Sequence, residues 1–62
     1  MTTRRQVSNE NTQLFEELLG EWDLLNTVTN VREDDFWTTF TFEVDEREEE
    51  LVDGLLESEE LN

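Results

Sequence analysis

The chain contains no cysteine, histidine, lysine, proline or alanine. Without cysteine or histidine, neither disulfides nor the usual zinc ligands can hold the fold together. With 62 residues, a folded chain buries only about 60% of the surface that its unfolded form exposes. Disulfides, metals and partner subunits are the usual supports of so small a core. We therefore expect a homodimer, and the alternative is a monomer whose two helices supply enough core.

The missing residue types also remove the usual catalytic groups. Histidine is the commonest general base and cysteine a common nucleophile. The remaining candidates are Ser8, Ser58 and acid pairs such as Asp34 with Asp35, none of which stands in a recognisable motif. No stretch matches the calcium loop pattern D-x-[DN]-x-[DN]-G. We expect a protein that is not an enzyme, has no cofactor or metal site, and attracts counterions only diffusely.

Long apolar runs are absent too. No window approaches the ~20 apolar residues that a membrane-spanning helix needs. The first residues, MTTRRQVSNEN, include two arginines but no apolar run like that of a secretory signal. These features favour a soluble, cytoplasmic protein.

Negative charge is what the chain has in excess. Eighteen acids and four arginines give a formal net charge of −14. Such a field repels nucleic acid and anionic membranes, and it attracts basic surfaces. Two tryptophans, four phenylalanines and nine leucines are more large apolar side chains than an acidic disordered tail carries. We expect a folded protein that binds neither nucleic acid nor membrane directly.

The pattern of apolar residues predicts a small α+β domain at residues 9–62, preceded by a flexible arm at residues 1–8. Ser8, Asn9 or Asn11 could cap a first helix, which Gly20 would terminate in a left-handed conformation. The apolar side of that helix is predicted from helical spacing, and its residues are Leu14, Phe15, Leu18 and Leu19.

Two strands and a second helix are expected to follow. Residues 22–31 are rich in β-branched side chains, residues 32–35 form a polar turn, and residues 36–45 alternate. The alternation places Phe36, Thr38, Phe40, Phe42 and Val44 on one face. Asp45 can cap the last helix, whose leucines repeat the spacing of the first. The predicted order is helix-strand-strand-helix, an antiparallel hairpin covered on one face by two helices. Because an isolated two-stranded sheet is marginal, pairing with a second copy is expected.

Acidic residues of the last helix fall on one outward strip about 21 Å long on a helical wheel. We interpret this strip as the surface that binds a basic partner, although a charge run is often only a solvated face. Its residues are Glu46, Glu49, Glu50, Asp53, Glu57 and Glu60. Glu16, Glu17, Asp34 and Asp35 could extend the surface. Trp37 points away from the phenylalanine face and is expected to lie in a dimer interface or to anchor a partner.

Two explanations of the acidity remain open. Carboxylates at phosphate-like positions could occupy the groove of a nucleic-acid-binding protein and inhibit it. Duplex DNA carries about one charge per 1.7 Å of axis, so mimicry would need two such strips. In composition alone, the chain resembles small acidic inhibitor proteins of viruses. The alternative is adaptation of a small dimeric regulatory or adaptor protein to molar salt, where the Debye length is about 3 Å.

Overall fold

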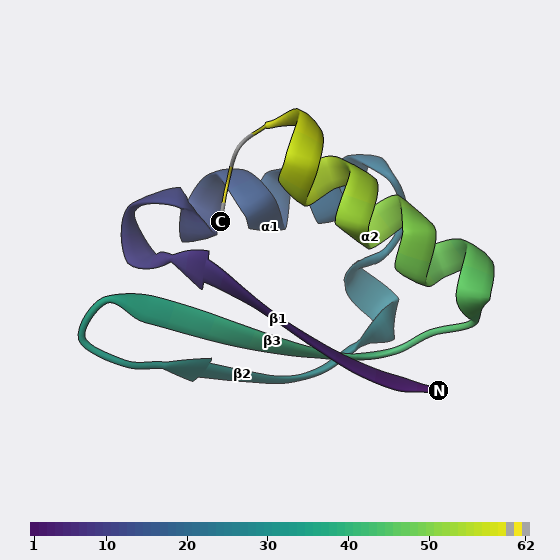
Figure 1. Ribbon diagram of the computed structural model, residues 1–62, viewed down its shortest axis with the longest axis horizontal. Coiled ribbons are helices and arrows are strands. Elements are labelled where there is room, and N and C mark those ends of the chain that lie inside the picture. Colours follow the sequence, from purple (N-terminus) through teal and green to yellow (C-terminus); the bar gives the residue numbers. More distant parts are fainter. Residues whose placement is uncertain (60, 62) are drawn as a thin grey trace.

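The computed structural model describes residues 1–59 and 61. They form a sheet of three strands covered on one face by two α-helices (Figure 1). The strands are β1 (Thr2–Ser8), β2 (Val28–Glu33) and β3 (Trp37–Glu43), and the helices are α1 (Thr12–Glu21) and α2 (Glu46–Ser58). Short 3-10 turns at Asn9–Asn11 and Leu25–Thr27 precede α1 and β2. The α+β class expected from the sequence is confirmed.

The sheet has one strand more than the sequence predicted. The strand order is β1-β3-β2, and β3 pairs antiparallel with both neighbours. Residues 2–8 were expected in a flexible arm but form β1 instead, in register with β3 from Thr2 opposite Glu43 to Ser8 opposite Trp37. The chain order is therefore strand, helix, strand, strand, helix. Backbone pairing with β3 and the burial of Val7 stabilise a segment whose own sequence has little apolar character.

The third strand removes one of the reasons for expecting a homodimer. Dimerisation was expected partly because a two-stranded sheet is marginal in water. Here β1 supplies the missing third strand from within the same chain. Dimerisation stays a prediction, based now on chain length alone.

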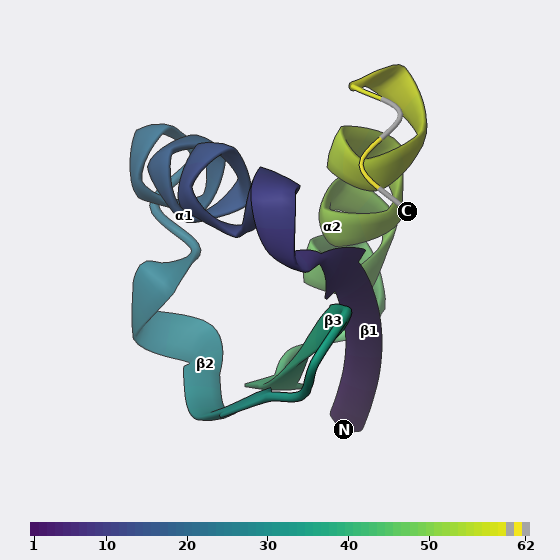
Figure 2. The same cartoon turned by 90° about the vertical axis from the view of Figure 1, so that its left-hand side faces the viewer.

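The core lies between the helices and the inner face of the sheet. The side chains of Phe40 and Phe42 in β3 point toward the helices, where the ring of Phe15 meets both edge-on, with centroids 5.0 and 6.3 Å apart. In the side view, α2 lies on the β1 side of the sheet and α1 on the β2 side (Figure 2). Among the described residues, eleven apolar side chains are buried: Val7, Phe15, Leu19, Leu24, Phe40, Phe42, Val44, Val52, Leu55, Leu56 and Leu61.

Three local expectations are corrected. The first hairpin strand begins at Val28 and not at Trp22, because the chain turns after α1 through Asp23, whose φ is 58°. Gly20 lies inside α1 and does not have a positive φ, so Asp23 takes the left-handed position expected of the glycine. Phe36 precedes β3 and is 76% exposed, so it does not belong to the buried phenylalanine face.

The start of α2 is confirmed. The Asp45 carboxylate accepts a hydrogen bond of 2.8 Å from the backbone N–H of Glu48, and the Glu48 side chain accepts one of 3.1 Å from the N–H of Asp45. This reciprocal capping box satisfies two backbone donors at the helix end. It fixes where the acidic residues of α2 begin.

Candidate functional site

The two α-helices hold half of the eighteen acids. The two helices together carry nine acids and one arginine, Arg47, which gives a net charge of −8. The three strands carry three arginines and two glutamates, a net charge of +1. Because both helices lie on one face of the sheet (Figure 1), the helical layer is acidic and the strands are nearly neutral, while most of the other acids lie in the connecting segments.

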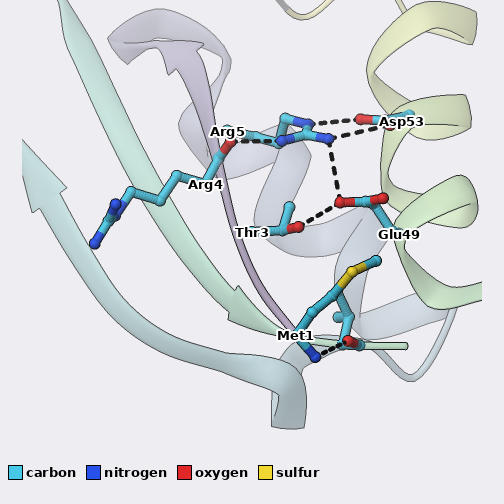
Figure 3. A network of polar contacts seen from close by, with 7 residues as sticks. Met1, Thr3, Arg4, Arg5, Glu49 and Asp53 are labelled. Carbon is cyan, nitrogen blue, oxygen red and sulfur yellow. Dashed lines mark hydrogen bonds and ion pairs between the residues drawn. The ribbon is translucent and has the colours of Figure 1, made fainter. Parts of the chain in front are cut away.

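The acidic strip expected on α2 divides into two groups. Glu46, Glu50 and Glu57 are exposed. Glu49 and Asp53 are only partly exposed, because they point toward β1 and contact residues of that strand (Figure 3). Glu60, the sixth acid of the strip, lies outside the described residues. The surface available to a partner on α2 is therefore smaller than the helical wheel indicates.

Arg5 of β1 forms ion pairs with the two inward acids of α2, Glu49 and Asp53. Its guanidinium donates hydrogen bonds to both carboxylate oxygens of Asp53, at 2.6 and 3.2 Å, and lies 3.6 Å from Glu49 (Figure 3). The Thr3 hydroxyl donates a hydrogen bond to the Glu49 carboxylate. A bidentate pair of this kind fixes direction as well as charge. The contacts attach the edge strand β1 to α2.

The titration of these groups follows from the contacts. The hydrogen bond from Arg5 holds the pKa of Asp53 below its ordinary value of 3.8. The same bond, together with the negative charges of Asp53 and Glu49, raises the pKa of Arg5 against the opposing effect of burial. At the other end of β1, a hydrogen bond from the Thr2 hydroxyl lowers the pKa of Glu43.

The remaining acids predicted to bind a partner lie in two separate elements, α1 and the β2–β3 turn. Glu16 and Glu17 are exposed on α1. Asp34 and Asp35 are exposed in the β2–β3 turn, where Asp34 lies 3.8 Å from Arg32. That turn and the start of α2 lie at opposite ends of the molecule (Figure 1). The turn therefore does not continue the surface formed by the first turns of α2.

Trp37 lies where the alternation predicted. It starts β3 on the face that turns away from the helices, and it is 43% exposed. Together with the more exposed Phe36 it lines a shallow hollow of about 340 Å³ beside Ser8 and Asn9. Its expected role in a dimer or as an anchor stays a prediction.

The outer face of the sheet is polar. It has a hollow of about 520 Å³ whose floor is formed by Thr39 and Thr41 of β3. Its other lining residues are Arg4, Gln6, Asn30, Arg32 and Asp34. Two of the four arginines, Arg4 and Arg32, thus lie on this face, and the sequence did not predict this separation of charge.

A third hollow lies on the helical side. It has a volume of about 240 Å³ and is lined by Trp22, at the end of α1, and by residues of α2. These are Glu50, Leu51, Gly54, Leu55 and Ser58. The sequence did not indicate this Gly54 hollow, because Trp22 was expected to begin a strand. A glycine inside an amphipathic helix was the signal that could have indicated it.

Two further properties concern the described residues only. Between residues 1 and 59 and at 61, no group of three or more acidic residues is arranged to hold a metal ion. Within the same part of the chain, neither helix has the length and apolar character needed to cross a bilayer.

Comparison with known proteins gives no relative for this chain. No protein-family model matches it, and neither does any curated protein or solved structure. Function must therefore be inferred from the surface itself.

Proposed function

We propose that this protein is a non-catalytic interaction protein whose helical layer binds a basic surface on a partner protein. The observation that carries the proposal is the separation of charge, −8 on the helices against +1 on the strands. A surface that only needed hydration would have no reason to leave one face of the sheet nearly neutral. A concentrated field on one face steers a basic partner toward that face and raises the association rate.

The exposed acids of α2 are the centre of the proposed surface. Glu46, Glu50 and Glu57 lie on one side of the helix, about 6 and 10 Å apart along its axis. These intervals are roughly two and three phosphate steps of one DNA strand, at ~3.4 Å each. Lysine or arginine side chains that contact phosphates two and three steps apart on one strand could therefore contact these carboxylates. Glu16 and Glu17 on α1 would add charge to the same layer.

The likeness to nucleic acid is partial. Duplex DNA carries about one charge per 1.7 Å of axis, and α2 is sparser still because Arg5 pairs with Asp53 and Glu49. The surface therefore imitates a few phosphates of one strand and not a whole duplex. We propose that the partner is a nucleic-acid-binding protein whose phosphate-contacting residues the helical layer occupies, so that the two ligands compete.

The experiment is capture of the partner from the native host at low salt, followed by elution with duplex DNA. We expect DNA to release a nucleic-acid-binding protein, and we expect this protein to inhibit nucleic-acid binding by the released partner. Release by salt but not by DNA would contradict the competition. Failure to retain any basic protein at low salt would contradict the proposal as a whole.

The matched control uses variants of equal charge. Glu50→Gln with Glu57→Gln removes two charges from the proposed surface. Glu10→Gln with Glu33→Gln removes two exposed charges that lie outside both α-helices. The amount of basic partner that the protein retains should fall with the first double variant and change little with the second.

A further inference from the structure

Gly54 has no structural reason to be glycine. It lies inside α2, does not have a positive φ, and an added Cβ would meet nothing within 4 Å. A glycine inside a helix costs about 1 kcal/mol relative to alanine. The other glycine is different, because a Cβ on Gly20 would lie 3.4 Å from the side chain of Leu25. The space beside Gly54 is thus open, and the fold does not use it.

That space is the apolar hollow between the end of α1 and α2. Trp22 stands at its edge and is 54% exposed, and Leu51 is 38% exposed. Tryptophan is well buried in most proteins, and in interfaces it often forms the centre of binding. A hollow of about 240 Å³ has the volume of roughly eight water molecules at ~30 Å³ each. It can therefore receive one large side chain.

The charge around the hollow defines what can enter it. Glu50 lines it, and the exposed Glu21 and Asp23 flank Trp22 in the sequence. Arg47, one helical turn before Leu51, is the only base of either helix. A second copy of this chain would bring its own charge of −14 against the same surface. A segment rich in lysine and arginine that carries one large apolar side chain is complementary both to the negative charge around the hollow and to its shape.

We infer that the Gly54 hollow receives a leucine-sized or phenylalanine-sized side chain of a basic segment on the partner. The absence of a side chain at Gly54 keeps the hollow open, Trp22 and Leu51 contact the entering side chain, and the surrounding carboxylates contact its basic neighbours. This inference rests on the proposed function and deepens it, because it turns a general electrostatic attraction into a recognised pattern of one apolar residue among bases.

The test uses two synthetic lysine-rich and arginine-rich peptides of equal charge. One carries a single leucine at its centre, and the other carries glutamine at that position. The protein carries Trp37→Phe, so that Trp22 is the only tryptophan and its fluorescence reports on the hollow. We expect the leucine peptide to bind at least about tenfold more tightly and to shift the emission of Trp22 to shorter wavelength.

A Gly54→Leu variant provides the sharper test, because it fills the hollow from within. Since the helix loses a glycine and an added Cβ meets nothing within 4 Å, the variant should fold with a higher melting temperature. It should bind both peptides with the affinity that the wild type has for the glutamine peptide. Gln13→Leu adds the same side chain at an exposed position of α1 outside the hollow, and it should keep the preference for leucine.

The outcomes separate this inference from the proposed function. If both peptides bind equally, or if Gly54→Leu keeps the preference for leucine, the hollow is not a recognition site although the acidic surface still binds bases. If Trp22 becomes buried with rising protein concentration in the absence of peptide, the occupant is a second copy and the inference is wrong. If neither peptide binds at low salt, the proposed function itself fails.

Discussion

Arg5 of β1 donates two hydrogen bonds to Asp53 of α2, at 2.6 and 3.2 Å, across 48 positions of the sequence. The pair has two consequences. It attaches the first strand to the last helix, and the positive charge of Arg5 offsets part of the repulsion between Glu49 and Asp53 on successive turns of α2. What remains exposed on that helix is a smaller set of carboxylates, held on a helix with a fixed start.

Replacing Arg5 should therefore destabilise the fold. We expect Arg5→Gln to lower the free energy of unfolding by about 1 kcal/mol, a modest value because the pair is partly exposed to solvent. Urea unfolding at low salt measures it. Arg32→Gln removes the same charge from a residue that is 76% exposed and 3.8 Å from Asp34, and it should change little. Equal losses in the two variants would show that net charge matters and the bidentate contact does not.

Because of the ion pair between Arg5 and Asp53, we expect the free energy of unfolding to depend on pH. Because Arg5 lowers the pKa of Asp53 in the folded state from 3.8, the unfolded chain takes up a proton there more readily than the native one. The stabilisation is complete above the ordinary pKa and is lost as the pH falls through the lowered native value. The difference in unfolding free energy between wild type and Asp53→Asn should therefore be constant near neutrality and shrink below about pH 4. A difference that persists at the most acidic pH would contradict this assignment.

The capping box at the start of α2 can be compared with the start of α1. Asp45→Ala removes a side chain that accepts a hydrogen bond from the helix, and it should cost about 1 kcal/mol of stability and some helical circular dichroism. Asn11, the residue before α1, makes no such hydrogen bond, so Asn11→Ala should cost clearly less. A larger loss for Asn11 would indicate that the two helix starts are not as described.

The dependence of folding on salt concentration distinguishes the proposed function from adaptation to molar salt. Arg5 offsets half of the charge of the two inward acids, and eleven apolar residues of the described chain are buried, so we expect a folded protein in dilute buffer. Added KCl should raise its melting temperature modestly by screening repulsion between the helical acids. Thermal melts followed by circular dichroism measure this. A chain that is unfolded in dilute buffer and folds only in molar KCl would favour the halophilic alternative.

The parts of the fold that the sequence predicted are those set by neighbours in the chain. Alternation identified the inward residues Phe40 and Phe42, and Asp45 as a helix cap together with the leucine spacing identified α2. Strand β1 could not be predicted in this way, because Val7 is the only apolar residue among its inward positions. Its structure depends on pairing with β3 and on the contact of Arg5 with Asp53, both of which are distant in sequence.

The candidate site was predictable to a similar extent. A helical wheel shows that the acids of α2 share one side, but it cannot show that Arg5 arrives from another element to occupy two of them. The separation of charge between helices and strands follows only once β1 is known to be a strand. The hollow beside Gly54 needs Trp22 to lie next to α2, which no local pattern specifies.

The most direct test of the central claim is the affinity of a lysine-rich and arginine-rich peptide for the two double variants that remove equal charge. We expect Glu50→Gln with Glu57→Gln to weaken binding roughly three- to tenfold, since exposed ion pairs contribute up to ~1 kcal/mol each. Glu10→Gln with Glu33→Gln should leave the affinity nearly unchanged. Equal weakening by both pairs, or none by either, would contradict the claim that the helical layer is the binding surface.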